Sequence, residues 1–167
     1  SAGNVPVSSV ARWDGVAWSA MGAGLRPVDT LQPLNNEQGG VRALISSPNG
    51  VIAVGVFDAS GTQTLNGVAE WNGVAWSPVG SAFGSSLAFP TAGVRAANGD
   101  LFVCGFAIFA PLPSFVMKWY GVTWTTLPPN TGSALVMAAM PSGNVVVSGP
   151  MSTAGCAIEE WDGTSWQ

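Results

Sequence analysis

A six-residue pattern, Trp-x-Gly-x-x-Trp, constrains the fold of this chain more than any other feature of its 167 residues. It occurs four times, and the four copies contain all eight tryptophans of the chain. The first tryptophans of successive copies lie 58, 48 and 42 residues apart. Such periods indicate tandem supersecondary units and are too long for a heptad or a leucine-rich repeat. The tryptophan pairs are Trp13 and Trp18, Trp71 and Trp76, Trp119 and Trp124, and Trp161 and Trp166.

Each copy predicts a β-hairpin. Asp-Gly or Asn-Gly between apolar residues is a strong hairpin pattern, because a type I′ turn needs positive φ at both central residues. With a two-residue loop at Asp14-Gly15, Trp13 faces Val16 and Ala11 faces Trp18, so the two tryptophans become diagonal neighbours on one face. The third copy carries Tyr120 at the Asx position, which weakens the turn prediction there.

A second type of hairpin precedes three of the four copies. Each example has an apolar strand, a turn built on Asn and Gly, a β-branched or aromatic strand and a closing glycine. The nearly continuous apolar runs favour strands that are covered on both faces. The three segments are residues 43–55, 94–105 and 137–149.

The two hairpin types together predict four-stranded units, whose strands we name A to D in chain order. We therefore expect an all-β chain of tandem four-stranded antiparallel blades, with about three and a half β-propeller-type repeats and 14 strands. The expected boundaries are a half repeat at 1–22, an insert loop at 23–40, repeat 1 at 41–79, an insert loop at 80–90, repeat 2 at 91–127 and repeat 3 at 128–167.

These motifs resemble the kelch-like, galactose-oxidase-type propeller repeats of large secreted bacterial proteins. The resemblance rests on residues 10–15 with Trp18-Ser19, and on the turns at 47–50 and 98–101. It covers almost all of the chain apart from the two inserts, and it implies a secreted or cell-surface location. Kelch repeats usually carry Gly-Gly after strand B, where this chain has Val54-Gly55, Cys104-Gly105 and Ser148-Gly149. Copper chemistry of the galactose oxidase type is not implied, because the chain has no His and only Tyr120 as tyrosine.

The composition excludes several function classes. Charged residues make up 8% of the chain, where about 25% is usual. Five dispersed cations at a net charge of −4 cannot neutralise a phosphate track, so no nucleic-acid partner is expected. The absence of His excludes a Ser-His-Asp triad and a His-ligated zinc ion. No membrane span is expected either, because Gly105, Pro111 and Pro113 interrupt the most apolar stretch.

The eight tryptophans are the candidate binding residues, and two interpretations compete. Stacking of Trp pairs between adjacent blades is favoured, because each aromatic ring buries about 150–250 Å². The alternative is a row of platforms for sugar rings, as in propeller lectins. Such sites also need polar groups beside the ring. The residues directly before each first Trp are Arg12, Glu70, Lys118 and Glu160. Their mixed charges favour a solvated strand face over one repeated ligand site.

Two further groups of residues are weak site candidates. Asp58, Ser60, Thr62 and Asn66 would share one B–C loop and could ligate calcium, but the equivalent loops at 109–113 and 151–153 do not repeat the pattern. Cys104 and Cys156 are either buried thiols or one bridge. We predict no resident metal, no cofactor and no catalytic residues.

The predicted function is a non-catalytic structural or interaction module of a secreted or cell-surface protein. Three and a half blades do not close a ring, so the expected partners are further blades of the same protein or identical subunits. The N-terminal C–D hairpin is the element expected to dock, because an open strand edge invites strand addition. A carbohydrate-binding lectin, with glycans as partners, is the alternative. Part of an enzyme whose site lies on other blades is the second alternative.

Overall fold

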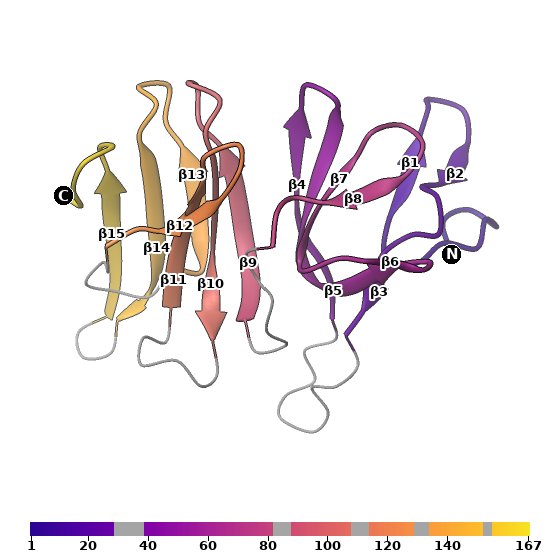
Figure 1. Ribbon diagram of the computed structural model, residues 1–167, viewed down its shortest axis with the longest axis horizontal. Helices are drawn as coiled ribbons and strands as arrows, with labels where there is room; N and C mark the ends of the chain where they lie inside the picture. Colours follow the sequence, from indigo (N-terminus) through magenta and orange to yellow (C-terminus); the bar gives the residue numbers. More distant parts are fainter. Residues whose placement is uncertain (29–38, 82–87, 108–113, 129–133, 152–154) are drawn as a thin grey trace. The chain divides into compact units, whose positions relative to one another are not determined.

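The computed structural model is all-β. It describes residues 1–28, 39–81, 88–107, 114–128, 134–151 and 155–167. The strands form four antiparallel sheets, and no helix occurs in these segments. The chain divides into two compact units, Ser1–Val79 and Gly80–Gln167, each of which is considered by itself (Figure 1).

The first unit contains a two-stranded and a six-stranded sheet. The two-stranded sheet consists of β1 (Ala11–Trp13) and β2 (Trp18–Ala20). The six-stranded sheet is built around β5, which pairs with β4 on one side and with β7 on the other over its first half. Its second half pairs with β3 and β6. The strands are β3 (Arg26–Pro27), β4 (Gly40–Ser47), β5 (Gly50–Ser60), β6 (Gln63–Thr64), β7 (Val68–Trp71) and β8 (Trp76–Pro78).

The second unit contains a four-stranded and a three-stranded sheet. The four-stranded sheet is a meander in which β9, β10, β11 and β12 follow one another in space as in sequence (Figure 1). In the other sheet β14 lies between β13 and β15, and an isolated bridge joins Trp161 to Trp166 where a fourth strand is expected. The strands are β9 (Ala88–Arg95), β10 (Leu101–Ala107), β11 (Ser114–Trp119), β12 (Trp124–Thr126), β13 (Val136–Ala139), β14 (Val145–Met151) and β15 (Gly155–Trp161).

The all-β class and the antiparallel pairing are confirmed. The four sheets of the described segments contain two, six, four and three strands, so only β9 to β12 form the expected four-stranded sheet. The strand boundaries also differ in detail. Strand β3 lies in the segment expected as the insert 23–40, of which residues 29–38 fall outside the described part. Strand β9 begins at Ala88, inside the expected insert 80–90, of which residues 82–87 are not described. Strands β3 and β6 were not expected, because two-residue strands have no recognisable sequence period.

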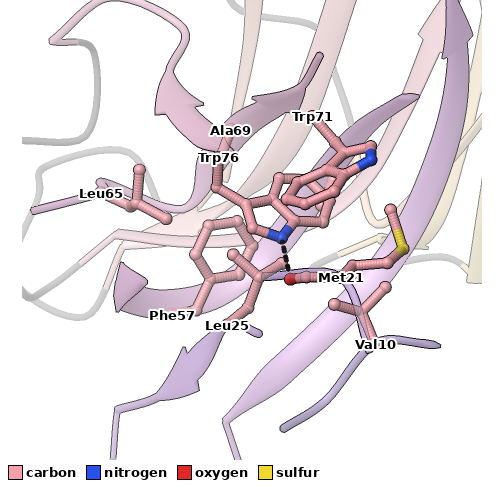
Figure 2. Close-up of a cluster of buried hydrophobic side chains, with 9 residues drawn as sticks. Val10, Met21, Leu25, Phe57, Leu65, Ala69, Trp71 and Trp76 are labelled. Atoms are coloured by element: carbon pink, nitrogen blue, oxygen red, sulfur yellow. Dashed lines mark hydrogen bonds between the residues drawn. The ribbon is translucent and has the colours of Figure 1, made fainter. Parts of the chain in front are cut away.

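Each unit has its own apolar core. Central strands supply most of it, since β5 and β10 are buried on both faces over much of their length. One core gathers Phe57, Leu65 and Ala69 with the Trp71–Trp76 pair, as Figure 2 shows. The other gathers Phe102, Cys104, Val145 and Val147 around Trp161. No helix in the described segments is long and apolar enough to cross a membrane.

Candidate functional site: the tryptophan hairpins

The turn between each Trp pair is organised by the residue that follows the first Trp. Oδ1 of Asp14 accepts hydrogen bonds from the backbone N–H groups of Val16 and Ala17, both at 2.8 Å. The backbone N–H of Asp14 in turn donates to the carbonyl of Ala17 at 3.3 Å. The loop therefore spans four residues, with positive φ at Gly15. Our expectation of a two-residue loop is wrong, because this backbone bond closes a wider turn, which the aspartate side chain reinforces as an Asx turn.

The wider loop changes the register of the hairpin. Trp13 lies directly opposite Trp18, and Ala11 lies opposite Ala20. The two tryptophans are thus direct cross-strand neighbours rather than diagonal ones. Their ring centroids are 5.4 Å apart with planes inclined at 50°, which is a favourable tilted aromatic arrangement.

All four hairpins repeat this geometry. The centroid distances in the other three pairs are 5.5, 5.3 and 5.3 Å. Asn72 accepts the same two turn hydrogen bonds as Asp14, each at 2.9 Å. Tyr120 offers no such acceptor, yet Trp119 still opposes Trp124. The backbone hydrogen bond from Tyr120 N–H to the Thr123 carbonyl is sufficient to close that turn.

The turn hydrogen bonds set the acidity of the two aspartates. Hydrogen bonds from the backbone N–H groups of Ala17 and Val16 lower the pKa of Asp14. The backbone of Ser165, followed by the side chain and backbone of Thr164, lowers the pKa of Asp162 to about 2. Both carboxylates are therefore committed to the turn as hydrogen-bond acceptors and are poor candidates for a proton-transfer role.

The second Trp of a hairpin is tied to the repeat that precedes it. The indole N–H of Trp76 donates to the carbonyl of Met21 at 3.0 Å, with Met21 three residues after the second Trp of the previous copy (Figure 2). The indole N–H of Trp166 donates to the carbonyl of Pro128 at 2.8 Å, with Pro128 four residues after Trp124. The second Trp thus anchors the segment that leaves the previous repeat.

The first Trp lies against a glycine of that same leaving segment. Gly22 has a φ of +61°, and a Cβ placed on it would lie 3.1 Å from Cζ3 of Trp71. Gly80 has a φ of +70°, and its Cβ would lie 2.5 Å from Cζ3 of Trp119. The glycine lets the backbone approach the indole more closely than any side chain would allow.

The first hairpin does not have this cover. Trp13 and Trp18 are 50% and 42% exposed, whereas Trp71, Trp76 and Trp161 are 9%, 3% and 6% exposed. Gly3, in the turn that pairs Ala2 with Val5, lies near Cδ1 of Trp18 and covers only that edge. The same aromatic pair is therefore buried in the second hairpin and exposed in the first.

The charged residue before the first Trp connects strand C to the turn of the A–B hairpin. Nζ of Lys118 lies 2.5 Å from Oδ2 of Asp100 and 4.8 Å from the centre of the Tyr120 ring. Ser47 donates a hydrogen bond to Glu70, and Asn144 donates one to Glu160. These three charged side chains are half-buried, so the expected solvated face is wrong for them. The signal that we missed is the polar residue in each A–B turn.

A groove of about 390 Å³ lies beside Trp161 in the second unit. Its lining is about equally polar and apolar and comes mainly from both A–B turns of that unit and from the last Trp hairpin. The polar lining residues are Asn98, Asp100, Lys118, Ser142, Asn144 and Asp162. The groove thus places hydrogen-bonding groups next to an aromatic residue.

The weaker site candidates have other partners. Asp58 and Ser60 belong to β5 rather than to a loop, and the Asp58 carboxylate pairs with Arg26 at 2.8 Å. Within the described segments, no three His, Cys, Asp or Glu side chains gather as a metal site. Cys104 is a free buried thiol, and burial raises its pKa to about 11. The side chain of Cys156 lies outside the described part.

Comparison of the chain with protein-family models, with curated proteins and with solved structures finds no match.

Proposed function

We propose that this chain is a non-catalytic structural or interaction module of a secreted or cell-surface protein, built from β-propeller-type blades. In this proposal the module is completed by further blades or by other subunits. The observation that carries it is the repeated use of the Trp hairpins in packing between repeats. Within each unit the second Trp anchors the segment that leaves the previous repeat, by the bonds from Trp76 to Met21 and from Trp166 to Pro128.

The topology of the sheets supports a blade arrangement. Strands β9 to β12 form a sequential four-stranded meander, which is the topology of a propeller blade. In the second unit the next sheet contacts this one, since the Thr91 hydroxyl donates to the Leu135 carbonyl at 2.7 Å. Secretion and the kelch-like relationship rest on the sequence motifs.

The aromatic pair on the first hairpin supports a role in assembly. Trp13 and Trp18 present ring surface whose equivalents in Trp71 and Trp76 are buried by a neighbouring repeat. Burial of apolar surface contributes about 25 cal/mol per Å² of favourable free energy. A partner that buries the rings of Trp13 and Trp18 therefore gains binding free energy, which favours association.

Sedimentation velocity over a wide concentration range tests this proposal. We expect species larger than the 17.0 kDa monomer that grow with concentration. A monomer that stays folded and unassociated at high micromolar concentration would contradict self-assembly. If it also bound no secreted or surface protein from the same source, the interaction role as a whole would be contradicted.

A carbohydrate-binding function is the second candidate, and the groove beside Trp161 favours it. Sugars are bound by polar groups next to an aromatic ring, and this groove supplies polar groups beside the exposed edge of the largely buried Trp161. A glycan array tests the candidate, with Asn98→Ala and Ser142→Ala as groove variants. Binding that is lost in both variants supports a lectin, and no binding by the unmodified chain would contradict it.

A further inference from the structure

The first strand of the chain has an open edge. In each of the other three repeats, the strand that carries the first Trp pairs with strand B of its own sheet: β7 with β5, β11 with β10, and β15 with β14. Strand β1 pairs with β2, and within the described segments no strand lies on its other side. Figure 1 shows this two-stranded ribbon near the start of the chain.

The backbone groups at that edge can be identified from the hairpin register. The N–H of Asp14 bonds across the turn to Ala17, so the backbone of Arg12, two residues earlier, also faces β2. The backbone N–H and C=O groups of Ala11 and Trp13 therefore point to the open edge. Their equivalents in the next repeat, Ala69 and Trp71, are the residues that oppose Ala53 and Val51 of strand B.

Arg12 supplies a charge at this edge. Its equivalents Glu70, Lys118 and Glu160 all contact a polar residue in the turn of the adjoining A–B hairpin. Charge and partner are matched in each pair. The ammonium group of Lys118 lies against a carboxylate, and the carboxylates of Glu70 and Glu160 each accept a hydrogen bond from a donor. The guanidinium of Arg12 is exposed, and its Coulombic attraction contributes slightly to the lowered pKa of Asp14.

We propose that the open edge of β1 binds a β-hairpin whose turn ends in an acidic residue. This inference rests on the proposed function and names the partner. The hairpin adds its second strand to β1 by backbone hydrogen bonds, which is β-augmentation. Its acidic side chain reaches Arg12 as Asp100 reaches Lys118. A guanidinium can bind a carboxylate with two parallel hydrogen bonds. The pairing therefore favours hairpins with an acidic residue at the end of the turn over hairpins without one.

The A–B hairpins of the chain provide the probe. A peptide of residues 93–107, kept reduced, has Asp100 at the end of its turn. It would be titrated into the full chain while amide chemical shifts of Ala11 and Trp13 are followed. We expect saturable shifts at both residues, with binding weakened by about ten-fold in an Asp100→Lys peptide, because like charges at an interface are strongly disfavoured.

Variants of Arg12 complete the test. Arg12→Glu should reverse the preference so that the Asp100→Lys peptide binds better, and Arg12→Lys should retain the original preference. Since Arg12 is exposed, the variants should leave the unfolding midpoint in urea unchanged. Equal binding of both peptides to the unmodified chain would overturn the inference.

The outcomes also separate this inference from the proposed function. If neither peptide binds while the chain still associates with itself in sedimentation, the edge of β1 is not the docking site and the proposed function stands. If neither peptide binds and no association occurs, the inference and the self-assembly part of the proposed function are both overturned. If the peptide shifts residues of another strand edge and leaves Ala11 and Trp13 unchanged, the inference fails alone.

Discussion

The indole N–H of Trp76 donates a hydrogen bond of 3.0 Å to the backbone carbonyl of Met21, 55 residues earlier in the chain. This bond joins a hairpin to the segment that leaves the previous repeat. Gly22, the next residue, lies against Trp71 of the same hairpin. Two adjacent backbone positions are thus held by the two tryptophans of one motif, which explains why the tryptophans occur in pairs.

Replacing Trp76 by Phe tests the value of this bond. The phenyl ring retains most of the apolar contact but leaves the Met21 carbonyl without its donor, so we expect a loss of about 1–3 kcal/mol in the free energy of unfolding. Trp18→Phe is the matched control, because Trp18 occupies the same position in an exposed hairpin. It should cost less than about 0.5 kcal/mol. Urea unfolding measures both, and equal losses would contradict the role of the bond.

Replacing Gly80 by Ala tests the close approach of backbone to indole. The added methyl would lie 2.5 Å from Trp119, so we expect about 1–3 kcal/mol from overpacking in addition to backbone strain. Gly121→Ala is the control in the same unit, because Gly121 also has positive φ but has nothing within 4 Å of its Cβ position. The difference between the two unfolding free energies isolates the overlap. No difference would show that Trp119 moves aside freely.

The contact between Lys118 and Asp100 predicts that a second substitution can restore the stability that a first one removes. Lys118→Glu places two carboxylates together and should destabilise the chain. Adding Asp100→Asn recreates the pair of Glu160 and Asn144 found in the next repeat. Neighbouring partners of this kind show coupling of about 0.5–3 kcal/mol in double-mutant cycles. Additive effects of the two substitutions would contradict the contact between strand C and the A–B turn.

The lowered pKa of Asp162 predicts that the stability of the folded chain decreases at acidic pH. Its pKa is lowered to about 2 in the folded chain, below the ordinary value of about 3.9. The stabilisation is therefore complete above the unfolded pKa and is lost as the pH falls through the folded one. Asp162→Asn should unfold with less change between pH 5 and pH 2, because Asn72 accepts the same turn bonds without a charge. Thermal melts across this range compare the two, and identical pH profiles would contradict the assignment.

The burial of Cys104 predicts that its thiol reacts slowly with thiol reagents in the folded state. Burial raises its pKa to about 11, and the thiolate is the reactive form. In a Cys156→Ser variant, a coloured disulfide reagent at pH 8 should modify Cys104 only at the rate of unfolding. Reaction in 6 M urea serves as the positive control. Rapid modification without denaturant would show that the site is open.

Some features of this chain follow from the sequence alone, because they depend on nearby residues. The repeated Trp-x-Gly-x-x-Trp pattern places a hairpin at each copy, and the Asn- and Gly-containing turns place the A–B hairpins. The order of strands A to D then follows, since strands that are consecutive in the chain tend to pair with one another, whereas the short strands β3 and β6 do not follow. The pairing of the tryptophans across each hairpin was also visible, although not its register.

The register itself depended on a hydrogen bond across the turn that the residue count does not reveal. Counting residues between Trp13 and Trp18 allows a two-residue loop, but the backbone hydrogen bond from Asp14 to Ala17 closes the wider one. The Asp14 carboxylate reinforces this turn, and the hairpin at Tyr120 adopts the same register without such an acceptor. That choice turns a diagonal aromatic pair into a direct one.

The tertiary structure decided which of these equivalent residues are buried and what they bind. Trp71 and Trp13 lie in the same motif, Trp-Asx-Gly-Val-Ala-Trp, yet Trp71 is 9% exposed and Trp13 is 50% exposed. The difference comes from residues of the preceding repeat, such as Met21, which pack against Trp71, whereas no such residues cover Trp13 in the described segments. Glu70, Lys118 and Glu160 likewise find partners in a turn that comes 16 or more residues earlier. Local sequence fixes a turn because its hydrogen bonds join residues a few positions apart. Burial is a property of the neighbour in space, and a repeated motif cannot encode which copy has one.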